Sequence, residues 1–315
     1  MDYKVHILAH NEEDLIEGCV RSVLAQSVGD LDTLSVVVIA NGCSDGTEEV
    51  VQGLCETDPR VSLFPIKGSG KVNALRFFLQ EFFKKEARLP ACDELLFFMD
   101  ADVKIMTPGA LETLARNLLA NDELYAASSF CIPESVYHKK LDFVSCLYRA
   151  QFKVQKALRP NIFRGMLYCV RASVLKEMIF PKNLLSDDIC LEICLDGHFR
   201  TDYEAPIVYK LHKGIKREIR RNFMHCFVVL QAYGLLREKK IKRIDPAPVN
   251  ERFRLRVLSV RDTAGYLLST FDILGMLLFS IHFVYRRYNI MKARRILREH
   301  GTQGVDYQAF WRTRR

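Results

Sequence analysis

The sequence lacks the marks of a disulfide-rich or zinc-binding protein. Its 315 residues include ten cysteines, but these form no Cys-x-x-Cys pair and follow no regular spacing. Cysteines scattered in this way are typical of small buried side chains in a reducing compartment, and they argue against a disulfide framework or a zinc site. The first residues also show no secretory signal pattern. We therefore expect a cytoplasmic protein.

The chain also lacks internal repeats and low-complexity tracts. Hydrophobic residues make up 49% of the sequence and charged residues 27%, proportions that suit a folded globular protein. The length allows one large α/β domain and a smaller appendage. The net charge is +8, and basic residues crowd the last third. No recognition motif accompanies them, so nucleic acid is not an expected partner.

An apolar run at residues 95–99 ends in two carboxylates one residue apart, Asp100 and Asp102. Five consecutive apolar residues predict a buried strand. Carboxylates at its open end can share a hard divalent cation, and Mg²⁺ bound in this way usually keeps several waters and contacts substrate phosphates. The alternative is that the two acids only begin a turn, because Asp-x-Asp alone is a weak signal.

Strands alternate with helices along the first half of the chain. Apolar runs at 5–9, 34–40 and 61–64 predict further strands, each followed by a polar loop and a segment of helical periodicity. This order predicts an α/β fold with a mostly parallel central sheet and helices on both faces. Ligands of such sheets bind beyond the carboxyl ends of the strands. We therefore expect one shared site for the polar residues that follow strand ends, which are Asp45, Lys71, Asp100 and Asp102.

Local structure offers simpler explanations for some of these side chains. Asn11 suits the cap of a first helix, and Thr47 or Asp45 suits the cap of a second. The Gly68-Ser69-Gly70-Lys71 sequence does not have the spacing of a phosphate-binding P-loop, although a lysine at a helix start can still meet an anion.

The middle of the chain is expected to be helical in three places. Thr107 as cap and Pro108 at the first position predict a helix that runs to about residue 119. The apolar pattern of residues 135–158 predicts a longer helix that packs against the sheet. Ser186 is the expected cap of a third helix, whose first turn is acidic.

Five short motifs follow one another between residues 8 and 188. In chain order they are Leu8-Ala9-His10-Asn11-Glu12-Glu13, Asn41-Gly42-Cys43-Ser44-Asp45-Gly46-Thr47, Gly70-Lys71-Val72-Asn73-Ala74-Leu75, Asp100-Ala101-Asp102 and Ser186-Asp187-Asp188. This series resembles the family 2 glycosyltransferases, which have the GT-A nucleotide-sugar fold, and the resemblance covers residues 4–225. The sequence departs from the family pattern at Leu8 or Ala9 in place of proline, at Asn41 in place of aspartate, and at Asp187 in place of glutamate.

The resemblance implies roles on the donor side of a site. Asn11, Glu12 and Asp45 would contact the base and ribose of a nucleotide-sugar donor, and Lys71 would lie near its base or phosphates. The departure at Asn41 leaves open how the base and ribose are contacted.

It also implies a metal site and a catalytic base. Asp100 would face the ribose and the metal shell, and Asp102 would bind Mg²⁺ or Mn²⁺ directly. Asp188, with Asp187 beside it, would be the general base that accepts the proton of an acceptor hydroxyl, a contribution of about 10²–10⁴-fold.

Further candidates follow in the second half. Arg164 and Gly165 resemble a stretch that lines the acceptor side in the family. His212 is either a third metal ligand or a polar residue at a strand end. Arg217 shares a helix face with arginines three and four residues on, and this face is either solvated or clamps the donor diphosphate.

Residues 226–315 are expected to form a basic, helical C-terminal region. The most apolar window, 264–285, nearly reaches the ~20 residues that span a bilayer. Asp272 and His282 interrupt it, and a central aspartate costs roughly 2.5–3.5 kcal/mol on insertion. We expect a helical appendage that packs on the domain or lies in the membrane interface, with a true span as the alternative. Flanking arginines would draw it to an anionic membrane surface, on the inner face of the membrane.

Residues 1–225 are thus predicted to form the catalytic domain of an inverting, metal-dependent glycosyltransferase. It would move one sugar from a nucleotide diphosphate donor, uridine-linked, to a hydroxyl of a glycan or a lipid-linked acceptor. The Gln-x-x-Arg-Trp motif of processive synthases is absent, which favours single transfer. The alternatives are a sugar nucleotidyltransferase, whose glycine-rich amino-terminal signature is missing, and an inactive nucleotide-sugar or membrane-surface binding protein.

Overall fold

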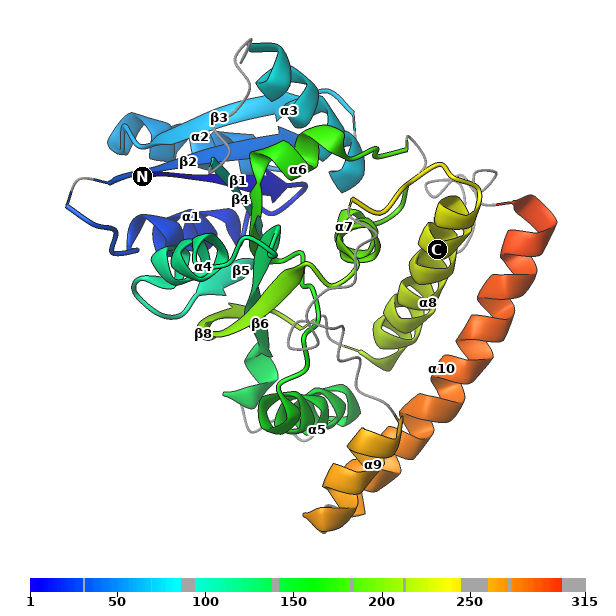
Figure 1. Cartoon of the computed structure of the whole chain (residues 1–315). Helices are drawn as coiled ribbons and strands as arrows, with labels where there is room; N and C mark the ends of the chain where they lie inside the picture. The colour runs from blue at the N-terminus through cyan, green and yellow to red at the C-terminus, as the bar shows by residue number, and fades with distance from the viewer. Residues whose placement is uncertain are drawn as a thin grey trace.

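The computed structural model describes residues 1–30, 32–68, 70–85, 94–137, 142–181, 184–211, 214–244, 260–270 and 273–301. Within these ranges the chain folds around one eight-stranded sheet with helices on both faces (Figure 1). The prediction of an α/β fold with a helical C-terminal region is confirmed. The strands are β1 (Asp2–Ala9), β2 (Thr33–Asn41), β3 (Val61–Ile66), β4 (Leu95–Asp100), β5 (Val103–Ile105), β6 (Ala126–Pro133), β7 (Leu167–Arg171) and β8 (Phe199–Tyr209).

The sheet has a parallel half and a mixed half. Its strand order is β3-β2-β1-β4-β7-β6-β8-β5, and the first four of these strands run parallel. Beyond β4, the strand β7 pairs antiparallel with both β4 and β6, while β8 is parallel to β6 and antiparallel to β5. The parallel half consists of the four strands that the apolar runs predict. All four therefore end at the same edge of the sheet, which is where the motif residues follow them.

The helices cover the sheet in two layers. On one face α1, α2 and α4 bury their apolar residues in one core cluster, and on the other face α3, α6, α7 and α8 form a second. Phe97 and Phe98, adjacent on β4, are both fully buried and belong to opposite clusters, as expected for side chains that alternate across a strand. The helices are α1 (Ile16–Leu24), α2 (Thr47–Thr57), α3 (Lys71–Lys85), α4 (Ala110–Leu119), α5 (Phe143–Leu158), α6 (Ala172–Glu177), α7 (Asp187–Leu195), α8 (Ile215–Arg237), α9 (Val260–Ser269) and α10 (Ile273–His300), with a 3-10 turn at Glu134–Val136.

Two of the predicted helix starts are wrong. Helix α4 begins at Ala110 after Gly109, whose φ of 76° belongs to the left-handed region that favours glycine. Thr107 and Pro108 therefore lie in the turn before the helix. The helix predicted from residue 135 is interrupted, because α5 begins only after Asp142, whose carboxylate accepts from the Ser145 amide at 3.0 Å.

The cap predicted at Asn11 is also wrong. Helix α1 begins at Ile16, and Asn11 lies five residues earlier with a φ of 58°. Its side-chain oxygen accepts a hydrogen bond from the amide of Ser44, at 2.8 Å. Asn11 thus joins the loops that follow β1 and β2 instead of capping a helix.

The C-terminal helices pack beside the sheet domain. Helix α8 runs without a break through residues 225 and 226, where the sequence places the division between two regions, and α10 lies alongside α8 (Figure 1). The apolar window 264–285 is divided between α9, which ends at Ser269, and α10, which begins at Ile273. Among the described residues, no helix has the length and apolarity required to cross a membrane.

Candidate functional site

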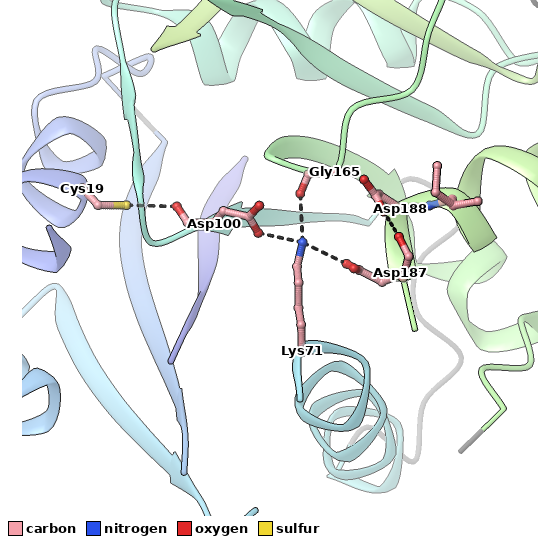
Figure 2. A network of polar contacts seen from close by, with 8 residues as sticks. Cys19, Lys71, Asp100, Gly165, Asp187 and Asp188 are labelled. Atoms are coloured by element: carbon pink, nitrogen blue, oxygen red, sulfur yellow. Dashed lines mark hydrogen bonds and ion pairs between the residues drawn. The ribbon is translucent and has the colours of Figure 1, made fainter. Parts of the chain in front are cut away.

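Lys71 connects three segments that are far apart in the sequence. As the first residue of α3 it extends its ammonium group to the Asp100 carboxylate at the end of β4, at 2.7 Å, and to Asp187 at the start of α7, at 3.2 Å. The same group donates to the carbonyl oxygen of Gly165, at 3.3 Å. Figure 2 shows Lys71 between these three partners. Three of the five sequence motifs therefore meet at one side chain.

The sheet topology explains how Gly165 reaches this point. Strand β7 runs antiparallel to β4, so the start of β7 lies beside the end of β4. The amide of Asp100 donates to the carbonyl of Met166 at 2.8 Å, directly after Gly165. On the other side of β4, the thiol of Cys19 donates to the carbonyl oxygen of Asp100 at 3.4 Å. The backbone on either side of Asp100 is thus held in place.

The charges of this group depend on one another. Burial raises the pKa of Asp100 to about 7, although Lys71 acts in the opposite direction. Burial also raises the pKa of Asp187, again against the effect of Lys71. Burial alone would lower the pKa of Lys71, but Asp100 and Asp187 together raise it well above its usual value. The lysine is therefore the cation that makes two partly or fully buried carboxylates tolerable.

Asp188 lies next to this group but makes different contacts. Its Oδ1 accepts hydrogen bonds from the Ser186 hydroxyl and from the Ile189 amide, the latter at 2.8 Å. Ser186 is at the predicted cap position of α7, but its hydroxyl contacts the Asp188 carboxylate and no backbone amide. Among the described residues, the other carboxylate oxygen of Asp188 has no hydrogen-bond partner. This oxygen is the one that can accept a proton from a bound molecule.

Gly165 permits the close approach of two segments at Asp188. A Cβ atom added to Gly165 would lie 2.3 Å from the Cβ of Asp188 and 3.3 Å from its Cα. The first distance is far below a van der Waals contact, so a side chain at this position would displace Asp188. Of the predicted pair Arg164 and Gly165, Gly165 thus lies against the candidate base, and the Arg164 amide donates to the Ser128 hydroxyl at 3.3 Å.

The loops after β1 and β2 form the second part of the site. The amide of Glu12 donates to the Thr47 hydroxyl at 2.8 Å, and the amide of Glu13 donates to Asp45 at 3.2 Å. Asp45 also accepts from the amide and hydroxyl of Thr47, at 3.1 and 2.5 Å. These bonds lower the pKa of Asp45, although its slight burial works the other way. Gly46 occupies the cap position of α2, so the cap predicted at Thr47 or Asp45 is wrong. The Asp45 carboxylate nevertheless holds the amide and hydroxyl of Thr47 and links this loop to the amide of Glu13.

Glu12 lies in an environment of like charge. Its pKa is raised from 4.5 to about 7 by burial, then by the carboxylates of Asp102 and Asp45, with Lys210 acting in the opposite direction. Glu12, Asp45 and Asp102 are each only partly buried, so their carboxylates remain within reach of a ligand. The like charges of Asp102 and Asp45 therefore disfavour ionisation of Glu12, and a cation bound nearby would relieve this repulsion.

The chemistry of these oxygen donors fits a hard divalent cation that is shared with a ligand. In the described ranges, no group of three or more histidine, cysteine, aspartate or glutamate side chains has the arrangement of a complete metal site. Asp100, the second predicted metal ligand, uses its Oδ1 in the ion pair with Lys71. His212, the third predicted ligand, lies outside the described residues.

Helix α8 borders the site with basic side chains. The guanidinium of Arg221 lies 4.8 Å from the centre of the Tyr148 ring and 3.6 Å from the Glu218 carboxylate. Burial lowers the pKa of His225 to about 4, with the nearby guanidinium of Arg286 adding to the effect. Arg217, the predicted diphosphate clamp, lies on the same helix and is exposed.

Sequence reasoning missed one contributor to the site, Tyr168, and left the role of another, Asn41, open. The hydroxyl of Tyr168 on β7 is fully buried and, among the described residues, has no hydrogen-bond partner. Its ring stacks on Phe98 at 5.4 Å, so the strand's packing positions it, and no motif signals it. Asn41 is also buried, and its side-chain oxygen accepts from the Gly70 amide at 3.3 Å. The departure at Asn41 thus links the end of β2 to the loop that carries Lys71.

The fold is similar to that of solved glycosyltransferases. A mannosyltransferase from Pyrobaculum calidifontis, in complex with GDP-Man and Mn²⁺, is 17% identical, with a TM-score of 0.53 over 92% of this chain and 84% of that one. The glucosyl-3-phosphoglycerate synthase from Mycobacterium tuberculosis is also 17% identical, with a TM-score of 0.47 over 76% of this chain and 80% of that one.

Similarity at this level of identity concerns the fold alone. No match was found among curated proteins. A sequence profile described as glycosyl transferase family 2 matches residues 4–174, more than half of the chain, and includes four of the five motifs. The chain belongs to glycosyl transferase family 2.

Proposed function

We propose that this protein is an inverting, metal-dependent glycosyltransferase that moves one sugar from a nucleotide diphosphate sugar to an acceptor hydroxyl. The observation that carries the proposal is the meeting of Asp100, Asp187 and Gly165 at the Lys71 ammonium group. It brings the Asp-x-Asp motif and the acidic start of α7 to one place. A site for a diphosphate and a site for a proton acceptor would then adjoin each other.

The donor would lie over the loops after β1, β2 and β3. Glu12 and Asp45, joined through Thr47, would contact the nucleoside, with Asn11 holding the second loop in place. Asp102, supported by Asp100, would hold Mg²⁺ or Mn²⁺, which offsets the negative charge that develops on the leaving diphosphate. Arg217 would approach the diphosphate from α8.

Asp188 would act on the acceptor. Its free carboxylate oxygen would accept the proton of the acceptor hydroxyl. At the same time, the hydroxyl oxygen of the acceptor would attack the anomeric carbon of the donor sugar. The bond from the carbon to the diphosphate oxygen breaks, and its electron pair leaves with the nucleotide diphosphate. This single displacement inverts the configuration at the carbon and needs no nucleophile from the protein. Asp187 would contribute by holding Lys71, and Arg164 and Gly165 would border the acceptor.

We propose a uridine-linked donor and a glycan or lipid-linked acceptor, with a guanosine-linked donor as the comparison. The solved mannosyltransferase of similar fold has GDP-Man and Mn²⁺ bound, which supports including guanosine donors in any test. A lipid-linked acceptor would be met at the cytoplasmic face of a membrane.

Donor hydrolysis tests the proposal without knowledge of the acceptor. UDP- and GDP-linked hexoses would be incubated with the full chain and Mn²⁺, and the products identified. The proposal expects slow release of nucleotide diphosphate that depends on the metal and is lost in Asp102→Ala. Release of pyrophosphate would instead identify a sugar nucleotidyltransferase. The absence of turnover with every donor, together with binding of one of them, would identify a binding protein.

A further inference from the structure

Helix α10 lies alongside α8 (Figure 1). The Tyr285 hydroxyl donates to the carbonyl of Ile219 on α8 at 2.7 Å, and the Asn289 amide donates to Asn222 at 3.1 Å. Asn289 is 2% exposed and Ala293, one turn on, is fully buried. These residues define the face of α10 that packs on α8.

The opposite face of α10 carries a row of exposed apolar side chains, the outer row. Its members recur every three or four residues, a spacing that places them along one side of a helix over about 27 Å. Isolated exposed apolar residues are ordinary, but a continuous row of this length marks an interaction surface. The outer row consists of Ile273, Leu277, Ile281, Val284, Tyr288 and Met291, which are 75, 58, 45, 68, 56 and 59% exposed.

Basic residues accompany the outer row. Arg287 lies beside it, and Arg294, Arg295 and Arg298 extend the same side of the helix beyond Met291, all of them exposed. Glu299 is the only acidic residue in the sequence of α10, and it accepts a hydrogen bond from Arg295 at 2.9 Å. The surface is therefore apolar over most of its length and positively charged at its C-terminal end.

Charge decides which partner fits this surface. A second copy of the chain would offer apolar side chains on α10, but its only acid there, Glu299, already pairs with Arg295, so the arginines would find no opposite charge on the partner helix. A bilayer that contains anionic lipids offers both an apolar layer and negative phosphates. This combination is the one that amphipathic interfacial helices with arginine on their polar flank recognise.

We infer that the outer row of α10 docks on an anionic lipid bilayer, with the apolar side chains at the boundary of headgroups and acyl chains and the arginines on lipid phosphates. This inference goes beyond glycosyl transfer and does not depend on it. Helix α8 packs against both α10 and α7, and α7 begins at Asp187. A single helix therefore separates the lipid-docking face from the candidate site.

Vesicle flotation of the full chain tests the inference. Vesicles of phosphatidylcholine alone would be compared with vesicles that also contain phosphatidylglycerol. We expect binding to the anionic vesicles that weakens at high salt. Replacing two exposed arginines, Arg287→Gln with Arg298→Gln, should weaken that binding about 30-fold, since each arginine near the surface contributes about fivefold.

Two matched double variants separate the outer row from general surface apolarity. Leu277→Gln with Val284→Gln should abolish binding to anionic vesicles. Met106→Gln with Ile179→Gln, at positions that are 45 and 54% exposed and outside α10, should leave it unchanged. Thermal melts would establish that all variants fold, and donor hydrolysis without vesicles should be equal in all of them.

The inference would be overturned by a wild-type chain that does not bind anionic vesicles, or by outer-row variants that bind as well as the wild type does. A dimer that the outer-row variants dissociate, with no vesicle binding, would assign the surface to a second copy instead. Loss of donor hydrolysis in every protein, with vesicle binding intact, would count against the proposed function and leave the lipid-docking surface standing.

Discussion

The site contains two groups of acids that differ in how their charge is balanced. In the lysine-bridged group, Asp100 and Asp187 share the Lys71 ammonium group at 2.7 and 3.2 Å. In the acid-rich group, Glu12 lies near Asp45 and Asp102, and only the weaker effect of Lys210 opposes the like charges. The first group is assembled and charge-compensated by the protein itself. The second calls for a cation from outside.

This difference assigns different tasks to the two groups. The ion pair of Lys71 with Asp187, whose side chain is only 3% exposed, holds the starts of α3 and α7 together. Removing one member of the pair would leave the other charge without compensation. A cluster of like charges is instead under repulsion that a bound divalent cation relieves. We therefore expect the lysine-bridged group to govern stability and geometry, and the acid-rich group to govern metal-dependent donor binding.

The largest effect is expected from Asp102→Asn in the acid-rich group. Metal-dependent donor hydrolysis should fall by about 10²–10³-fold, equivalent to about 2.7–4 kcal/mol. The melting temperature without metal should stay the same or rise slightly, because one of three repelling charges is removed. Rates and thermal melts measured on the same preparation check both parts. A large loss of stability would contradict the division of tasks.

The opposite pattern is expected from Lys71→Met. The buried Asp187 loses its cation, and the free energy of unfolding should fall by about 2–3 kcal/mol, less than for a fully buried pair because Lys71 is partly exposed. Chemical denaturation measures this loss. Lys67→Met, four residues earlier at an exposed position, is the control and should change the stability little. An equal change in the free energy of unfolding for both variants would show that the ion pairs of Lys71 do not stabilise the fold.

A smaller effect is expected from Gly165→Ala, which disturbs the contact between the segments that contain Gly165 and Asp188. The added Cβ would meet Asp188 at 2.3 Å, and relieving this overlap should cost about 1–3 kcal/mol of stability and reduce donor turnover. Gly53→Ala, in α2 with nothing within 4 Å of its added Cβ, should instead stabilise by about 0.5–1 kcal/mol. Denaturation of both variants tests whether close approach matters. If Gly165→Ala changed neither the stability nor the donor turnover, Asp188 would not lie in contact with Gly165.

The smallest effect concerns the pH dependence of stability. Glu12 has a pKa near 7 in the folded chain against 4.5 ordinarily, so the folded state binds more protons than the unfolded state between these values. Stability should therefore decrease as the pH rises from about 4.5 to about 7, and this contribution should not change further above pH 7. Glu12→Gln should flatten the curve of melting temperature against pH in that interval. If Glu12→Gln left the curve of melting temperature against pH unchanged, Glu12 would not be affected by the charges of Asp45 and Asp102.

Much of this arrangement could be predicted from the sequence, for a physical reason. The apolar runs of the parallel half predict the strands, and parallel strands end at one edge, where Lys71 after β3 meets Asp100 at the end of β4 at 2.7 Å. The mixed half was not predictable in the same way. Strand β7 pairs antiparallel with β4, a long-range choice that no local pattern records.

The contacts within the site were also out of reach of sequence reasoning. The motifs predict where Lys71 and Asp187 lie, but not that they pair, since that pairing depends on how α7 packs on the sheet. The left-handed conformation of Asn11 and the buried hydroxyl of Tyr168 also depend on tertiary packing, so the sequence does not predict them. The apolar window 264–285 predicted neither its division between α9 and α10 nor the packing of α10 on α8, which leaves the outer row exposed.

We expect the acid-rich group to bind a divalent cation together with a nucleotide diphosphate. The most direct measurement is anomalous diffraction at the manganese edge from crystals grown with UDP and Mn²⁺. The account predicts one anomalous peak within bonding distance of the Asp102 carboxylate and of the diphosphate, with the nucleoside beside Glu12 and Asp45. A manganese peak bound away from Asp102, or a nucleotide bound on another face of the molecule, would contradict it.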